Sequence, residues 1–152
     1  MRILLLNGPN LNTLGQREPH IYGYETLDGI VAKVEARAAQ LDTTVVAFQS
    51  NHEGSLIDFL QQNAAGAEGL IVNAGSLTHT SIGLRDAIAG SGLPMVEVHI
   101  SNVHARERFR QHSYLSAIAR GVIVGLGWRG YIYALEALVA LRQDQSEAAE
   151  GR

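Results

Sequence analysis

The residues best suited to chemistry in this sequence include a histidine with a nearby carboxylate. Glu97, His99 and Ser101 are spaced by two in VEVHIS, so in a strand they project from one face while apolar residues occupy the other. A carboxylate beside an imidazole fixes its tautomer and tunes its acidity, which suits a general acid or base. The same spacing also suits a buried hydrogen-bond cluster with no catalytic role, and the sequence leaves both interpretations open.

A second polar group follows the first apolar run, in NGPNLNTLGQREPHIYG at residues 7–23. Amide and guanidinium groups are costly to bury without partners, so this segment predicts a loop that lines a site. Its glycines and prolines supply turns and hinges around Arg17 and Tyr22. A phenol ordinarily ionises near pH 10, but a nearby cation favours the phenolate, which can act as a base. Packing of a surface tyrosine is the alternative.

Histidine and aspartate also interrupt a helical pattern at residues 79–90. His79 and Asp86 fall at positions i and i+7, which predicts that one helix face carries both. Thr78 and Ser81 at the start of this pattern offer hydroxyl caps. A face that served only the core would be apolar, so we interpret His79 and Asp86 as candidate ligand-binding residues.

Two arginines follow closely after the VEVHIS segment. Arg106 and Arg110 are four residues apart in HARERFRQHS, a spacing that predicts one shared helix face. Guanidinium groups bind carboxylates through two parallel hydrogen bonds, so the pair suggests an acidic ligand. Arginines on a solvated surface are the alternative.

The sequence lacks the motifs of several common catalytic and cofactor-binding sites. The chain has no cysteine, no HExxH and no GxSxG, so the sequence favours a site without metal or cofactor. GLGWRG at 125–130 matches the glycines of a dinucleotide loop but lacks the later strand and acidic residue of that motif. We therefore predict that these glycines serve close packing of a strand against a helix. The only lysine, Lys33, lies on the polar face of a predicted helix, which argues against imine catalysis.

Five apolar runs provide the elements that must position these side chains. They cover residues 2–7, 44–49, 69–74, 94–100 and 121–127. Nearly continuous apolar runs are typical of parallel strands buried on both faces, and helical patterns separate them. The alternation predicts an α/β fold: a flavodoxin-like, doubly wound, five-stranded parallel sheet with helices on both faces. Ligands bind such sheets beyond the C-terminal strand ends, so we expect the polar clusters to converge on one pocket.

Length and composition suggest one domain. The chain has 152 residues, of which 46% are hydrophobic, enough for a continuous core, which we assign to residues 1–142. Residues 143–152 are predicted to be a polar, disordered tail. A net charge of −3 without a basic tract argues against a nucleic-acid partner, and no apolar run is long enough to span a membrane. We therefore expect a cytoplasmic protein. Because only 18% of residues are charged, part of the surface is expected to be covered in a homo-oligomer.

Taken in order, these motifs resemble type II 3-dehydroquinase, also called 3-dehydroquinate dehydratase. The resemblance runs from RILLLNGPNLNTLGQREPHIYG through THTSIGLRDAI and VEVHISNVHARERFRQHSYLS to GVIVGLG. It implies cofactor-free dehydration of 3-dehydroquinate to 3-dehydroshikimate through an enolate, in the shikimate route to aromatic amino acids or in quinate breakdown. It also implies a homododecamer arranged as a tetramer of trimers.

The resemblance assigns roles to residues of this chain. It implies that Tyr22 is the proton acceptor, that Arg17 stabilises the transition state and that His99 is the proton donor. Asn12 would orient a water molecule or the enolate oxygen, and Glu97 would hold the His99 ring. The implied substrate-binding residues are Asn73, His79, Asp86, Arg110 and the backbone amides of Ile100 and Ser101. The loop that carries Tyr22 would close over the pocket and exclude water.

Some features leave other classes open. Ala74 and Leu77 stand where family members usually carry proline and tyrosine, although neither position performs the chemistry. A flavodoxin-like module that only binds a small carboxylic acid would have no use for a base, an acid and an activating cation together. A flavin-binding electron carrier would need a phosphate loop rich in glycine and hydroxyls after the first strand, where Pro9 and asparagines stand.

Overall fold

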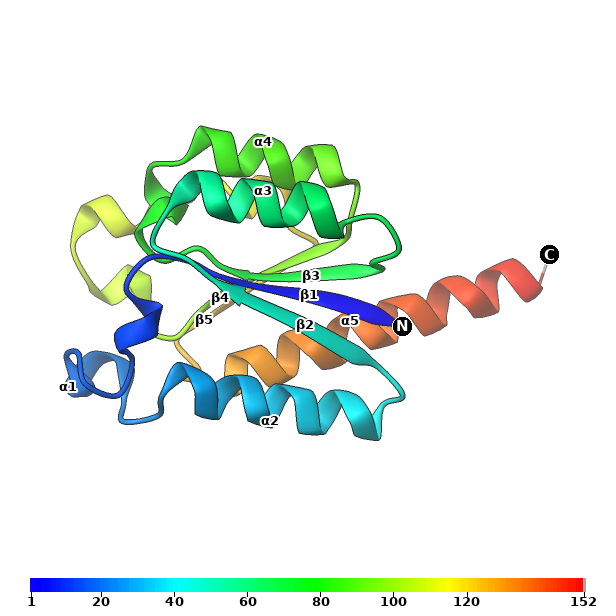
Figure 1. Cartoon of the computed structure of the whole chain (residues 1–152), viewed down its shortest axis with the longest axis horizontal. Coiled ribbons are helices and arrows are strands. Elements are labelled where there is room, and N and C mark those ends of the chain that lie inside the picture. Colours follow the sequence, from blue (N-terminus) through cyan, green and yellow to red (C-terminus); the bar gives the residue numbers. More distant parts are fainter. Residues whose placement is uncertain (152) are drawn as a thin grey trace.

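A five-stranded parallel sheet forms the centre of the molecule in the computed structural model, which describes residues 1–151 (Figure 1). The strands are β1 (Arg2–Asn7), β2 (Thr44–Gln49), β3 (Gly69–Asn73), β4 (Met95–His99) and β5 (Gly121–Val124). Their order is β2-β1-β3-β4-β5, and every neighbouring pair is parallel. This is the flavodoxin-like order, so the predicted fold class is confirmed.

Helices cover both faces of the sheet. They are α1 (Pro19–Tyr22), α2 (Leu27–Gln40), α3 (Glu53–Asn63), α4 (Ile82–Ser91) and α5 (Arg129–Glu150). Figure 1 shows α3 and α4 on one side and α2 and α5 on the other. The Ser81 hydroxyl accepts a hydrogen bond from the Leu84 amide and caps α4, as predicted. Thr78 is not a cap, because it lies buried in the preceding 3₁₀ turn, Gly75–His79.

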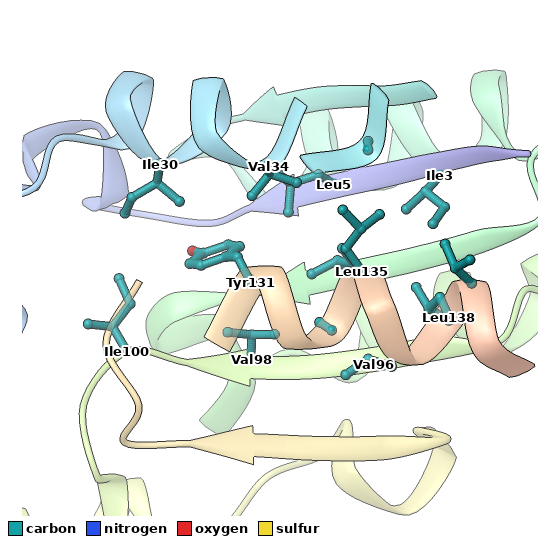
Figure 2. Packing of buried hydrophobic residues seen from close by; sticks show 14 of the residues in the cluster. Ile3, Leu5, Ile30, Val34, Val96, Val98, Ile100, Tyr131, Leu135 and Leu138 are labelled. Atoms are coloured by element: carbon teal, nitrogen blue, oxygen red, sulfur yellow. The ribbon is translucent and has the colours of Figure 1, made fainter. Parts of the chain in front are cut away.

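The core consists of two apolar layers, one on each face of the sheet. Successive residues of a strand point to opposite faces, so Ile3 and Leu5 pack with α2 and α5 (Figure 2). The other layer contains Leu4 and Leu6 together with residues of α3 and α4. All four side chains are at most 1% exposed, and each contributes roughly 1.5–3 kcal/mol by burial. These layers hold the strand ends in fixed register.

The strand order reverses between β1 and β3. In the register of this pair, Asn7 lies opposite Asn73, and both are the last residues of their strands. The opening loop and the 3₁₀ turns after β3 and β4 gather at this end of the sheet (Figure 1). Polar side chains that follow these strands therefore meet at one edge, where doubly wound sheets bind ligands.

The end of the chain differs from the sequence prediction. Residues 143–150 continue α5 instead of forming a disordered tail, and Figure 1 shows this helix extending beyond the sheet. Its buried side chains end at Val139, but alanine, glutamate and glutamine are good helix formers and prolong it without a core partner. Residue 152 lies outside the described residues. Within residues 1–151, no helix is both long and apolar enough to cross a bilayer.

Candidate active site

A polar cavity of about 120 Å³ lies at the C-terminal ends of the strands. It is lined by Pro9, Asn10, Leu11, Arg17, Tyr22, Asn73, Gly75, Ser76, His79, His99, Ile100, Ser101, Val103, Arg106 and Arg110. Among these lining residues three are arginines and none is an acid, which favours an anionic ligand. Drug-sized pockets measure roughly 300–1,000 Å³, so a cavity of this size suits a small ligand.

His99 is held at the cavity wall by a buried carboxylate. Its Nε2 lies 2.6 Å from Oε1 of Glu97, which is fully buried one pleat earlier on β4. The predicted common face of these residues is confirmed, since Val96 and Val98 pack in the opposite layer. The contact fixes the ring and leaves Nδ1 as the nitrogen available to a ligand.

Two hydroxyl groups also donate hydrogen bonds to Glu97. Ser113 donates to Oε1 at 2.7 Å, and Ser116 donates to Oε2 at 2.6 Å. Burial raises the pKa of Glu97, but the hydrogen bonds from His99, Ser116 and Ser113 together lower it below the ordinary value. The carboxylate is therefore ionised at neutral pH and can stabilise a positively charged His99.

Tyr22 lies between two guanidinium groups. The Cζ atoms of Arg17 and Arg106 are each 5.2 Å from the centroid of its ring, and Arg106 Nη1 donates to its hydroxyl at 2.8 Å. The Arg106 side chain is only 14% exposed, so its charge is weakly screened. Two positive charges therefore lie beside the ring, and one of them is hydrogen-bonded to the Tyr22 hydroxyl.

The segment that carries Tyr22 is only partly anchored in the core. Helix α1 has a single turn with Pro19 at its start and no buried residue. Gly15, Glu18 and Gly23 have positive φ angles of 88°, 39° and 81°, so the chain turns sharply on either side of the helix. Tyr22 itself packs partly against the apolar layer that contains Ile3 and Leu5.

Asn73 and His79 present neutral polar groups. His79 Nδ1 lies 2.6 Å from the His112 carbonyl oxygen, to which it donates. Burial lowers the pKa of His79, an effect partly opposed by this hydrogen bond. The ring is therefore neutral at pH 7, with Nε2 as an acceptor. Asn73 is 4% exposed, and its Oδ1 accepts from the Gly75 amide at 3.2 Å.

Ser101 and Arg110 complete the cationic side of the cavity, but not by the predicted helix. Short 3₁₀ turns at Val103–Ala105 and Arg108–Arg110 replace one continuous helix, so Arg106 and Arg110 share no helix face. Both still line the cavity. Ser101 Oγ accepts from Arg106 Nη1 at 3.3 Å, and Glu107 holds Arg110 Nε at 2.7 Å.

Besides Glu97, which lies behind His99, two residues named from the sequence do not line the cavity. Asn12 is exposed, whereas Asn10 lines the cavity in its place. Asn10 has a φ of 68°, a left-handed conformation that asparagine tolerates, and the chain turns sharply there before Asn12. The GPN sequence directly after an apolar strand was the available signal, because Pro-Asn favours such turns.

Asp86 is not brought near His79. Helix α4 begins at Ile82, after His79, so the i and i+7 spacing does not lie on one helix. The Asp86 side chain is 67% exposed, and its Oδ1 lies 3.6 Å from Arg85 Nη1. Asp86 lines a different groove, between α3 and α4. Within residues 1–151 no three His, Asp or Glu side chains gather as a metal site requires.

The sequence of this chain is similar to proteins of one known family. A family model described as dehydroquinase class II matches residues 1–139. The chain belongs to this family. It is 57% identical over 143 residues to a 3-dehydroquinate dehydratase of Corynebacterium glutamicum, covering 93% of this chain and 98% of that one. It is 55% identical over 134 residues to catabolic 3-dehydroquinase 1 of Aspergillus fumigatus, covering 88% and 89%.

Solved class II dehydroquinases have the same fold. The crystal structure of type II dehydroquinase from Butyrivibrio crossotus superimposes with a TM-score of 0.89 at 44% identity, covering 91% of this chain and 97% of that chain. The two departures from the family pattern are accommodated in the core. Ala74 is 1% exposed, and Leu77 packs against the layer that contains Leu4 and Leu6.

Proposed function

We propose that this class II dehydroquinase converts 3-dehydroquinate to 3-dehydroshikimate without a cofactor, through an enolate. The observation that carries the proposal is Tyr22, held between two guanidinium groups in the same cavity as His99. The reaction needs a base beside the ketone and an acid for the departing hydroxyl, and these two groups supply them. The product belongs to the shikimate route to aromatic amino acids or to quinate breakdown.

Tyr22 acts first, as a phenolate that removes the hydrogen next to the ketone. The charges of Arg17 and Arg106 beside the ring, and the hydrogen bond from Arg106 to the hydroxyl, would stabilise the negative charge of this base. Arg17 is the more exposed of the two cations, so the better buried Arg106 gives the larger share. The enolate oxygen is then oriented by Asn10, which takes the role that the sequence suggested for Asn12.

His99 acts second and protonates the hydroxyl that leaves. Glu97 holds the ring and stabilises its protonated form, and the two serine hydroxyls keep Glu97 ionised. Because the carboxylate already accepts three hydrogen bonds, little rearrangement is needed when His99 gains or loses its proton.

The remaining lining residues bind the substrate. Arg110 and the backbone amides of Ile100 and Ser101 form the cationic and donor-rich part of the cavity, which suits the substrate carboxylate. Asn73 and His79 offer a donor and an acceptor to the ring hydroxyls. A polyhydroxylated acid thus finds a partner for each of its polar groups.

We also propose a homo-oligomer, the dodecamer built as a tetramer of trimers. Large exposed apolar side chains such as Ile82, Phe109 and Leu126 support a covered surface. Asp86 supports it as well, because it lies outside the cavity of its own chain and can bind substrate only in the cavity of another subunit. Light scattering at micromolar concentration tests the assembly, and a monomer would contradict it.

We propose residues 1–142 as the catalytic unit. Every lining residue falls between Pro9 and Arg110, and the buried part of α5 ends at Val139. A chain truncated after residue 142 is therefore expected to keep its turnover number within about twofold. A loss of activity in a folded truncation would show that the exposed end of α5 takes part.

One assay tests the proposed reaction. Protein dialysed against a chelator is mixed with 3-dehydroquinate, and the ultraviolet absorbance of the conjugated enone product is followed. We expect a rise that is proportional to protein concentration and independent of added metal. No rise with folded wild-type protein would refute the enzymatic function and leave a module that only binds small acids.

A further inference from the structure

The mechanism leaves a buried phenol without a role. Tyr131 projects from the first turn of α5 into the apolar layer of Figure 2 and is fully buried. Burial strongly raises the pKa of its hydroxyl, so the group is neutral. An aliphatic or phenylalanine side chain would fill the same volume, and a hydroxyl in the core is costly unless it is hydrogen-bonded.

This hydroxyl joins two asparagines. It donates to Asn7 Oδ1 at 2.7 Å and accepts from Asn73 Nδ2 at 2.8 Å. Asn7 and Asn73 end the neighbouring strands β1 and β3, at the point where the strand order reverses. Of the three residues only Asn73 lines the cavity, so the other two act on the site through it.

The backbone sets the direction of these hydrogen bonds. The Gly75 amide can only donate, so the Asn73 atom it contacts must be Oδ1. Nδ2 of Asn73 therefore faces Tyr131, whose oxygen must accept. The single hydrogen of the Tyr131 hydroxyl is therefore donated to Asn7 Oδ1. The direction of each of these three hydrogen bonds is thus fixed.

Close packing of α5 brings the phenol to this place. A Cβ atom on Gly130 would lie 3.2 Å from Ile123 and 3.3 Å from Val98, so glycine permits the start of the helix to approach the sheet. This confirms the predicted role of a glycine in the GLGWRG segment. The position of Tyr131 is thus fixed by the fold.

We propose that Tyr131 is a positioning residue that fixes the amide of Asn73 for substrate binding. With Nδ2 and Oδ1 each holding one protein partner, Asn73 retains one N–H and one lone pair, a donor and an acceptor suited to a substrate hydroxyl. Without the phenol oxygen, the Asn73 N–H loses its partner, and the Gly75 amide alone holds the side chain. This inference rests on the proposed function, because its ligand is the polyhydroxylated substrate.

The test is a double-mutant cycle on the KM for 3-dehydroquinate, with Tyr131→Phe, Asn73→Ala and the double variant. We expect Tyr131→Phe to raise KM about tenfold with kcat within about twofold, because a buried donor is left unpaired. In the Asn73→Ala background the same substitution should change KM less than twofold. Tyr133→Phe, on the exposed side of the same helix, is the matched control and should leave both constants unchanged.

Two results would overturn the proposal: a normal KM in Tyr131→Phe, or a rise that is equally large in both backgrounds. The second would indicate a general loosening of the core. Should Tyr131→Phe fail to fold, Asn7→Ala removes the acceptor of the hydroxyl instead, and its KM is expected to rise severalfold only when Asn73 is present. Wild-type protein that does not convert 3-dehydroquinate would refute the proposed function itself, a result distinct from either outcome.

Discussion

His99 and Tyr22 line the same cavity but are held in it by different means. His99 ends β4, a strand with every residue buried, and its partner Glu97 accepts three hydrogen bonds, all from residues 99–116. Tyr22 ends a one-turn helix with no buried residue, and cations from two separate segments hold its ring. We refer to these as the acid side and the base side of the cavity.

The difference indicates which part of the site is formed before the substrate arrives. The acid side is part of the sheet and has its hydrogen bonds complete, so it is preorganised. The base side depends instead on charges that meet across a loop with glycine turns at Gly15 and Gly23, and no buried residue fixes its helix. Substitutions on the acid side and on the base side should therefore affect turnover differently.

Removing the acid should nearly stop turnover without disturbing the fold. We expect His99→Asn to lower kcat about 10³-fold with little change in KM, since proton transfer typically contributes 10²–10⁴-fold. Steady-state kinetics by enone absorbance measures this effect. His104→Asn, an exposed residue outside the cavity, serves as the control. Near-normal turnover in His99→Asn would mean that the acid side has been assigned to the wrong residue.

On the base side, the loss of one cation should be smaller but still large. Arg106→Ala is expected to lower kcat about 10²-fold, because it removes both a charge and the hydrogen bond to Tyr22. Arg17→Ala should cost less, since that side chain is 40% exposed. The exposed Arg108 provides the control substitution. If Arg108→Ala were as damaging as Arg106→Ala, net charge and not geometry would support the base.

A third test weakens the preorganisation of the acid side. Ser116→Ala removes one donor to Glu97, and we expect kcat to fall about five- to tenfold. Because the pKa of Glu97 is lowered in the fold, its stabilisation is complete above the ordinary carboxyl range and is lost as the pH falls through its folded pKa. In the variant the folded pKa is less depressed, so the stability lost on acidification should be smaller and the loss should end at a higher pH. Urea unfolding between pH 7 and pH 3 measures it, and superimposable curves would contradict a charge-stabilising role for the serine.

The smallest effect concerns His79. Burial lowers its pKa in the fold, so the unfolded chain binds more protons and stability falls as the pH drops below the ordinary histidine value near 6.5. His79→Asn should remove this part of the slope between pH 7 and pH 5.5 in urea unfolding. His104→Asn, which replaces an exposed histidine outside the cavity, is the matched control. An unaltered slope in His79→Asn would show that the ring is as readily protonated as in water.

The sheet and the acid side could be predicted because both follow from simple periodicity. Continuous apolar runs indicate strands packed on both faces, and a spacing of two places Glu97 and His99 on one face in any strand. β1 and β2 have the predicted bounds, residues 2–7 and 44–49. These features depend only on local backbone geometry.

The base side was less predictable because it depends on turns and on segments distant in sequence. Because the chain makes a left-handed turn at Asn10, this residue lines the cavity and Asn12 does not. Arg106 reaches Tyr22 from 84 residues further along the chain, where 3₁₀ turns replace the predicted helix. Asp86 does not line the cavity, because α4 starts three residues after His79 and the two residues do not share a helix. No spacing rule encodes such contacts.

The most direct test of the division between the two sides is hydrogen exchange at the carbon next to the ketone. 3-Dehydroquinate is incubated in D₂O with each variant and followed by proton NMR, with a protein-free sample for background exchange. We expect His99→Asn to exchange this hydrogen while forming almost no enone, because Tyr22 still makes the enolate. Tyr22→Phe should bind the substrate yet show only background exchange. Exchange at the wild-type rate in Tyr22→Phe would contradict the assignment of Tyr22 as the base.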